Sequence, residues 1–245
     1  MWVKKRAVLN FLYIWLMTLF NDFISLIFPQ ICAACGKLLF KNEEIICTKC
    51  LYKLPKTNFH NSADNPVMQI FWGRIELHSA AAFLNFTKSG KVQHLVHQLK
   101  YKHKTEVGIL LGELYGTDLK SADLFSSVDI VIPVPLHWKK QKKRGFNQSE
   151  MFGRGLAKSM NAKLDTKSLI RKVDTPTQTK KSREQRWENV RNVFELENKE
   201  QIEGKHILLV DDVITTGATM EASANTLLAV PGVKVSVATI AFASK

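Results

Sequence analysis

The chain has 245 residues and a mass of 27.8 kDa, with 45% hydrophobic and 23% charged residues. These proportions are ordinary for a globular protein and exclude a collagen-like, a disulfide-dense or a largely disordered chain. Its 35 Lys and Arg against 22 Asp and Glu give a net charge of +13. Such a charge favours polyanionic partners: nucleic acid, an anionic membrane surface or a phosphate-rich small molecule. At ~150 residues per domain, the length predicts one large domain and one small module.

Residues 1–29 contain a short basic cluster followed by an apolar run. This order is typical of a signal sequence, but no small-x-small cleavage site follows. Asn21 and Asp22 interrupt the run before ~20 apolar residues are reached. Three interpretations remain open: an apolar N-terminal helix packed on the protein or a partner, a helix at a membrane surface, or a poor transmembrane anchor. We favour the first and then the second.

All four cysteines lie within residues 30–54, as the pairs Cys32, Cys35 and Cys47, Cys50. Four thiolates in two Cys-x2-Cys pairs can surround one tetrahedral zinc ion and leave no open position for catalysis. Two disulfides are the alternative, and they need an oxidising compartment. No cleavable signal peptide is evident. The spacing therefore predicts a compact zinc ribbon that holds a structural Zn²⁺.

The hydrophobic pattern of the chain after the cysteines changes near residue 75. Residues 55–74 show no hydrophobic period, and we expect them to be a linker. From residue 75 onward, apolar strands alternate with apolar helical stripes, which is typical of an α/β fold with a mostly parallel sheet and flanking helices. We expect strands at 79–86, 128–134, 207–210 and 233–242, and helices over 92–99, 106–115 and 147–160, the last with Asn147 as its N-cap.

The most informative segment follows the strand at 207–210, where two adjacent acids precede a loop of small residues that leads into a helix. In open α/β sheets, ligands bind at the carboxyl ends of strands. Backbone N–H groups, hydroxyls and the positive end of a helix suit a phosphate, and carboxylates suit sugar hydroxyls. Gly217 lets the backbone approach a ligand closely. The segment therefore predicts a holder for ribose 5-phosphate, made of Asp211, Asp212, Val213, Thr215, Thr216, Gly217, Ala218 and Thr219.

A strand, a turn and a capped helix without a ligand are the alternative for this segment. A cap alone does not require two acids, three threonines and a glycine in this order, so we favour the ligand site. Two adjacent carboxylates repel each other, which a protein tolerates more readily where Mg²⁺ or a hydroxyl-rich ligand binds. We therefore expect Asp211 and Asp212 at the mouth of the sheet, without a strong Lys or Arg partner when the site is empty.

This segment resembles the phosphoribosyl-pyrophosphate (PRPP) loop of type I phosphoribosyltransferases. Together with the four cysteines, further segments are similar to the ComF family, whose members pair a zinc finger with a phosphoribosyltransferase-like domain. These segments are 99–102, 131–135, 139–148, 175–178 and 183–190. The resemblance runs from about Phe28 to the C-terminus. It implies a small four-Cys zinc ribbon followed by a type I phosphoribosyltransferase-like domain over residues 75–245.

The resemblance also implies a reaction. PRPP binds with Mg²⁺, and a nucleophile displaces pyrophosphate at C1 of the ribose, as in an amidophosphoribosyltransferase. Asp211 and Asp212 would be the catalytic pair and hold the ribose hydroxyls, the second through Mg²⁺, while residues 215–219 hold the 5-phosphate. No glutaminase segment is visible, and the acceptor is not identifiable from the sequence.

Two further groups of residues acquire roles through the resemblance. Lys100, Tyr101 and Lys102 match the place of the pyrophosphate loop, although a solvated basic end of a helix is the alternative. Arg183 and Arg186 match a mobile hood, although a surface helix with internal ion pairs is the alternative.

The family is associated with DNA uptake in natural competence, which leaves other functions open. One is a non-catalytic nucleic-acid-binding competence protein that retains the PRPP-binding fold, and another is a regulator that binds a phosphorylated ribose. Single-stranded DNA and competence proteins would then be partners. Support comes from the net charge, the cysteine module and a basic cluster: Lys139, Lys140, Lys142, Lys143 and Arg144. Thiolate zinc sites and PRPP belong in the cytoplasm, where we expect the protein, without stable membrane insertion.

Overall fold

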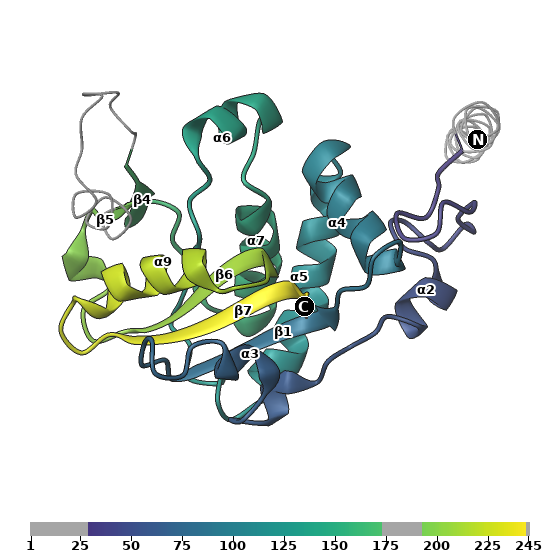
Figure 1. Ribbon diagram of the computed structural model, residues 1–245. Helices are drawn as coiled ribbons and strands as arrows, with labels where there is room; N and C mark the ends of the chain where they lie inside the picture. Colours follow the sequence, from purple (N-terminus) through teal and green to yellow (C-terminus); the bar gives the residue numbers. More distant parts are fainter. Residues whose placement is uncertain (1–28, 173–192, 244–245) are drawn as a thin grey trace, which may run out of the picture. The chain divides into compact units, whose positions relative to one another are not determined.

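The computed structural model describes residues 29–172 and 193–243, in two units that divide after Lys53 (Figure 1). The apolar run before residue 29 and the two hood arginines, Arg183 and Arg186, lie outside the described residues. Within the described ranges, no helix combines the length and the apolar character needed to cross a membrane. Among its described residues, 29–53, the first unit contains the short helix α2 (Thr48–Tyr52).

The second unit is built on a five-stranded sheet in the order β1-β7-β6-β2-β3. All four strand pairs of this sheet are parallel, as the alternation of strands and helices predicted. Its strands are β1 (Ser79–Asn85), β2 (Ile130–Pro133), β3 (Lys163–Leu164), β6 (His206–Ile214) and β7 (Lys234–Phe242). A separate antiparallel pair consists of β4 (Leu169–Arg171) and β5 (Phe194–Leu196).

Helices flank this sheet (Figure 1). The longer ones are α4 (Lys91–Tyr101), α5 (Thr105–Lys120), α7 (Gln148–Met160) and α9 (Ala218–Leu228). The shorter ones are η1 (Phe59–Asn61), α3 (Pro66–Gln69), α6 (Trp138–Arg144) and η2 (Lys199–Gln201). The α/β fold with a mostly parallel sheet and flanking helices is thus confirmed.

The central strand β6 is longer than the sequence predicted, and its two neighbours end at different points. Residues Ile207 to Val210 are fully buried, which explains their uninterrupted apolar character. On one side β7 pairs with β6 as far as Ile214, whereas on the other side the pairing with β2 ends at Pro133 opposite Val210. Asp211 and Asp212 are therefore inside the strand but beyond the end of the β2 pairing, where the sheet opens.

Helices α5 and α7 approach each other closely through glycine. A Cβ atom on Gly155 of α7 would lie 2.1 Å from the carbonyl oxygen of Ile109, and one on Gly112 of α5 would lie 2.2 Å from the carbonyl oxygen of Phe152. A glycine inside a helix costs ~1 kcal/mol relative to Ala. The close packing of α7 explains why Gly155 is present despite that cost.

Residues 55–74, which we expected to be a linker, contain η1 and α3 and pack on the sheet. Asn65 caps α3 by accepting the N–H groups of Val67 and Met68, and its Nδ2 donates to the Ala80 carbonyl oxygen at 2.8 Å. Val67 and Phe71 are completely buried in the core. The sequence conceals this packing because the segment is short and its few apolar residues follow no regular period.

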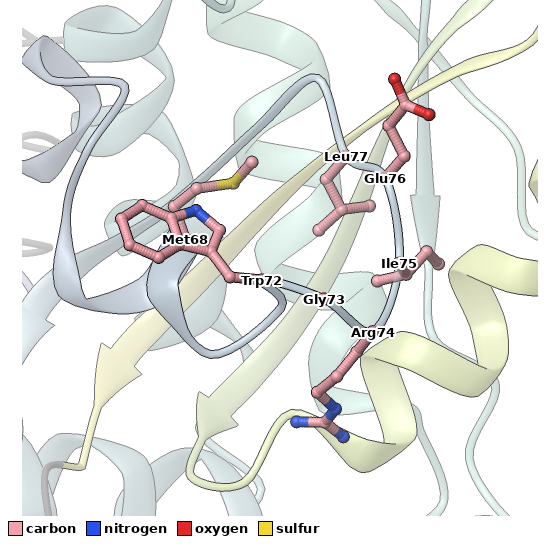
Figure 2. Close-up of a pocket in the computed structure, with 7 residues that line it drawn as sticks. All are labelled: Met68, Trp72, Gly73, Arg74, Ile75, Glu76 and Leu77. Carbon is pink, nitrogen blue, oxygen red and sulfur yellow. The ribbon is translucent and has the colours of Figure 1, made fainter.

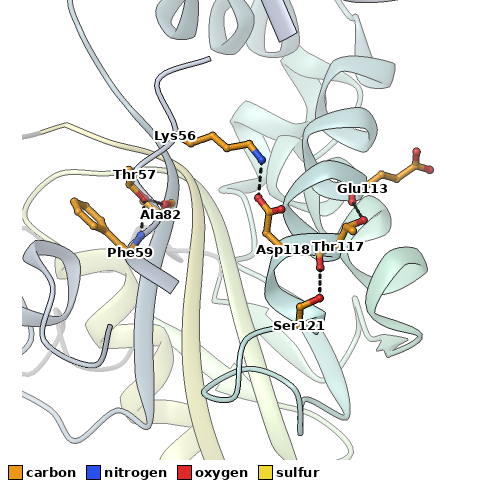
Figure 3. A network of polar contacts seen from close by, with 8 residues as sticks. All are labelled: Lys56, Thr57, Phe59, Ala82, Glu113, Thr117, Asp118 and Ser121. Atoms are coloured by element: carbon orange, nitrogen blue, oxygen red, sulfur yellow. Dashed lines mark hydrogen bonds and ion pairs between the residues drawn. The ribbon is translucent and has the colours of Figure 1, made fainter. Parts of the chain in front are cut away.

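The start of this segment is also joined to the sheet and to α5, as Figure 3 shows. Thr57 donates its hydroxyl to the carbonyl oxygen of Ala82 in β1. Lys56 Nζ lies 2.9 Å from Asp118 Oδ2 of α5. Residues 55–74 thus belong structurally to the second unit.

Candidate functional site

The two acids of β6 form a hydrogen-bonded pair at the opening of the sheet. Asp211 is partly buried, and only 7% of the Asp212 side chain is exposed. Asp211 Oδ1 accepts the Ser149 hydroxyl at 2.6 Å and the Asp212 backbone N–H at 2.8 Å. Burial and the neighbouring Asp212 carboxylate raise the pKa of Asp211 to about 7.

Lys100, at the end of α4, pairs with the second acid. Its Nζ lies 2.8 Å from Asp212 Oδ2, and 21% of its side chain is exposed. The expectation that the acid pair has no strong basic partner is therefore wrong. Two adjacent carboxylates withdrawn from water repel each other, and a nearby cation lowers the energy of that arrangement. In this structure, Lys100 supplies the cation.

The acid pair opens into a pocket of about 270 Å³ whose walls come from four parts of the second unit. Four basic side chains and two carboxylates line it, together with polar groups from the starts of α7 and α9. The lining residues are Lys100, Tyr101, Val134, Pro135, Leu136, Lys140, Arg144, Gln148, Ser149, Arg171, Asp211, Asp212 and Thr219. A cavity with this lining suits a ligand that carries both hydroxyl groups and several negative charges.

The start of α7 is fixed by Asn147, as the sequence predicted. Its Oδ1 accepts the Ser149 N–H at 3.1 Å, and its Nδ2 donates to the Val134 carbonyl oxygen at 3.0 Å. This double contact ties the helix to the end of β2 and directs Ser149 toward Asp211. Arg144 donates to Gln148 in the first turn of the same helix.

The segment between β2 and α7 therefore contributes to the pocket, which our sequence analysis missed. Lys140 and Arg144 line it, although we assigned both residues only to nucleic acid. Ser149 and Arg171 were not candidates at all. One signal could have identified part of this wall: the carboxyl ends of adjacent parallel strands meet at one edge, so residues that follow β2 should lie near those that follow β6.

Of the other residues predicted from the sequence, some line the pocket and others lie outside it. Lys100 and Tyr101 line it, whereas Lys102, which follows α4 as its C-cap, does not. The Tyr101 ring is 61% exposed, and the Arg144 guanidinium lies 5.4 Å from its centroid. Lys139, Lys142 and Lys143 are exposed on α6, outside the pocket lining.

Residues 215–217 connect β6 to α9, and Thr219 lies in the first turn of that helix. Thr215, Thr216 and Thr219 are exposed, and Thr219 reaches the pocket. Gly217 is the N-cap of α9 and has a φ of +74°, in the left-handed region that favours glycine. The first N–H groups of a helix have no acceptor within it, so this end of α9 can donate to an anion.

The four cysteines form a separate cluster in the first unit. All four are free thiols, and their Sγ atoms lie within 4.8 Å of one another. The Sγ atoms of Cys35 and Cys47 are 3.9 Å apart, close to the ~3.8 Å expected for two ligands of a tetrahedral zinc ion with Zn–S bonds of ~2.3 Å. The cluster could therefore bind a metal such as zinc, and the predicted grouping is confirmed.

The thiols of this cluster differ in acidity. Burial opposes ionisation of Cys32, but N–H groups, among them that of Cys47 at 3.3 Å, lower its pKa to about 7. Burial and the neighbouring cysteines raise the pKa of Cys50 to about 12. Four thiolates at this spacing need a cation to offset their charge, which is what a divalent metal supplies.

A family model of the phosphoribosyl transferase domain matches residues 147–245. DNA utilization protein YhgH of Escherichia coli O6:H1 is 29% identical over 202 residues, which cover 81% of this chain and 84% of that protein.

Two proteins named for competence are also similar. Competence protein F of Haemophilus influenzae is 29% identical over 131 residues, covering 51% of this chain and 57% of that protein. Competence protein ComFC of Bacillus subtilis is 32% identical over 99 residues, covering 40% and 38%.

Among solved structures, the chain is similar to the glutamine phosphoribosylpyrophosphate amidotransferase from B. subtilis. The sequence identity is 20% and the TM-score 0.40, over 58% of this chain and 30% of that one. The relatives, the matched domain and the four-cysteine cluster agree with the resemblance to the ComF family that the sequence showed.

Proposed function

We propose that this protein binds PRPP together with Mg²⁺ in the pocket at the end of β6 and transfers the phosphoribosyl group to a nucleophile. The observation that carries the proposal is the meeting of three features around one cavity: the acid pair, the start of α9 and four basic side chains. PRPP combines a ribose, a 5-phosphate and a pyrophosphate, and each feature suits one of these parts.

The ribose and its phosphate would lie against β6 and the loop that follows it. Asp211 and Asp212 accept hydrogen bonds from the ribose hydroxyls, and each such bond to a charged acceptor contributes ~1.5–3 kcal/mol. The 5-phosphate accepts N–H and hydroxyl bonds from residues 215–219, aided by the positive end of α9.

The pyrophosphate would lie among the basic side chains that line the same pocket. Lys100 and Tyr101 of α4 were predicted for this role, and the shared pocket adds Lys140, Arg144 and Arg171. When the bond at C1 breaks, negative charge grows on the departing pyrophosphate. Cations already held in place stabilise that charge in the transition state without further reorganisation.

The acid pair fits a divalent cation because hard cations prefer carboxylate oxygens. Bound Mg²⁺ would neutralise negative charge on the pyrophosphate. Lys100 then has two partners that exclude each other: Asp212 in the empty protein and the pyrophosphate in the complex. Binding would release Lys100 from Asp212 and leave that carboxylate to the cation and the ribose.

The proposal is tested by calorimetric titration of the full chain with PRPP, ribose 5-phosphate and pyrophosphate, each with and without Mg²⁺. We expect PRPP to bind more tightly with Mg²⁺ and more tightly than either fragment. Release of pyrophosphate from PRPP, with ammonia or water as the nucleophile, measures transfer chemistry. Absence of binding by all three ligands would overturn the proposal, whereas binding without pyrophosphate release would limit it to a PRPP-binding role.

A second candidate function is binding of single-stranded DNA, which is favoured by the exposed surface of α6. Its lysines Lys139, Lys142 and Lys143 lie outside the pocket, and the exposed Trp138 has Lys139 Nζ 5.5 Å from its ring centroid. Basic groups beside exposed aromatic rings are typical of surfaces on which bases stack. Titration of a labelled oligonucleotide across salt concentrations tests this function, because affinity should fall steeply as salt rises.

We further propose that the cysteine cluster holds one structural Zn²⁺ through Cys32, Cys35, Cys47 and Cys50. The spacing of the sulfur atoms supports this assignment, and four protein ligands leave no position for substrate. Metal analysis of protein purified without chelators should find one zinc per chain. A protein without zinc, whose thiols all react with a thiol reagent under native conditions, would contradict it.

A further inference from the structure

The loop at the start of α9 is held from outside by residues 70–74, a part of the chain that we had expected to be a linker. Figure 2 shows Arg74 extending from this segment toward the first turn of α9. Arg74 Nη1 donates to the carbonyl oxygen of Thr216 at 2.9 Å and to that of Ile70 at 3.1 Å. Its Nη2 pairs with Glu221 on α9. One side chain thus joins the segment, the loop and the helix.

The bond to Thr216 determines the direction of the next peptide group. A trans peptide is planar, so its C=O and N–H point to opposite sides. Because Arg74 holds the Thr216 oxygen, the Gly217 N–H points to the opposite side of the loop, away from Arg74. That side is where we place the phosphate, and a correctly directed N–H is a main source of affinity for an anion.

Gly217 is also confined by packing from the same segment. A Cβ atom at this position would lie 2.7 Å from Ile70 Cγ2 and 3.0 Å from Phe71 Cε1. Phe71 is fully buried, so this wall cannot move aside easily. Residues 70 and 71 therefore limit where the loop can lie, and Arg74 orients its backbone.

We propose that Arg74 is a positioning residue for the 5-phosphate: it fixes the Thr216 carbonyl and thereby directs the Gly217 N–H into the phosphate-binding loop. This inference rests on the proposed function of the same site, and it assigns a role in ligand binding to a residue outside the pocket. Arg74 does not line the pocket of the acid pair, so it would act on the ligand only through the loop.

The test compares Arg74→Gln with Arg154→Gln in the full chain. Arg154 is also exposed and paired with an acid, Glu150, but it is not among the residues that line the pocket. We expect Arg74→Gln to weaken ribose 5-phosphate and PRPP binding by roughly tenfold, which corresponds to ~1.4 kcal/mol. Binding of inorganic pyrophosphate should stay within about twofold of the parent, and Arg154→Gln should bind all three ligands like the parent.

Two further measurements separate positioning from general destabilisation. Arg74→Lys keeps the positive charge beside Glu221 but lacks the planar guanidinium group. We therefore expect its affinity for ribose 5-phosphate to lie between those of Arg74→Gln and the parent. In amide NMR spectra, the Gly217 resonance should shift on addition of ribose 5-phosphate in the parent and in Arg154→Gln, and shift less in Arg74→Gln.

The inference is overturned if Arg74→Gln binds ribose 5-phosphate as the parent does, or if it loses pyrophosphate binding to the same degree. Failure of the proposed function gives a different result, because the parent itself would then bind neither PRPP nor ribose 5-phosphate.

Discussion

Two connections leave the same edge of the sheet, and both lead to residues that line one pocket. The connection from β6 to α9 is short and made of small residues, with Thr216 and Gly217 at its turn. The connection from β2 to α7 is long and basic, carries α6, and ends at Asn147. Under the proposed function, the first would hold the ligand mainly through backbone N–H groups and the second through side chains. Substitutions in each connection separate these two contributions.

The largest expected effect comes from removing the charge of the acid pair. The double variant Asp211→Asn, Asp212→Asn should weaken PRPP–Mg²⁺ binding by roughly 100-fold or more, because two bonds to charged acceptors are lost. Calorimetric titration measures the loss. Asp123→Asn, an exposed acid outside the pocket lining, is the control and should bind like the parent. Unchanged PRPP affinity in the double variant would contradict the assignment of the pair.

A second comparison divides α6 into its two sets of basic residues. Lys140→Gln with Arg144→Gln should weaken pyrophosphate and PRPP binding by roughly tenfold or more, because both side chains line the pocket. Lys142→Gln with Lys143→Gln should leave PRPP binding unchanged. Both pairs should weaken binding of single-stranded DNA to a similar degree, as expected where phosphate contacts dominate. An equal loss of PRPP affinity in both double variants would show that PRPP binding depends only on the net charge of α6.

Gly217→Ala tests the connection from β6 to α9, and Gly204→Ala is its matched control. Both glycines have positive φ values, +74° and +66°, but a Cβ atom at Gly204 would meet nothing within 4 Å. Each variant should incur a backbone cost of ~1–2 kcal/mol. Only Gly217→Ala should lose further stability through contact with Ile70 and also weaken ribose 5-phosphate binding. Equal melting temperatures for the two variants would contradict the packing argument.

The ion pair between Lys100 and Asp212 predicts that removing Lys100 changes the affinities for Mn²⁺ and for PRPP in opposite directions. Lys100→Met should bind Mn²⁺ alone several-fold more tightly, because the cation no longer competes with Lys100 for the carboxylate. The same variant should bind PRPP less tightly. Lys102→Met, from the same end of α4 but outside the pocket lining, is the control. Weaker Mn²⁺ binding in Lys100→Met would mean that Lys100 supports the cation site.

The smallest effect concerns pH. The pKa of Asp211 in the folded protein, about 7, lies above the ~3.9 of an unfolded chain. The folded state therefore holds this proton more tightly, and its contribution to stability is lost as pH rises from about 4 to about 7. Asp211→Asn lacks this dependence. Thermal melts across this range should show the parent losing a few degrees relative to the variant, and a constant difference would contradict the raised pKa.

Local sequence by itself determined two features of this protein: the segment from Asp211 to Thr219 and the cysteine cluster. The acids, threonines and Gly217 stand within nine residues, and each cysteine pair spans four. In both cases the chemistry of the site requires residues that are neighbours in the chain, so the pattern is visible without a fold. The apolar run at Ile207 to Val210 likewise indicated a central strand, because a strand buried on both faces has no polar positions.

The tertiary structure decided what the rest of the pocket contains. Lys100 is more than 100 residues from Asp212 in the chain, and Ser149 is more than 60 residues from Asp211, so no local pattern could reveal either contact. The same is true of Arg74 and Thr216, which meet because residues 66–74 fold back onto the sheet. Desolvation of an acid pair, and the cation that offsets it, depend on which distant elements close over a strand end, and only packing determines that.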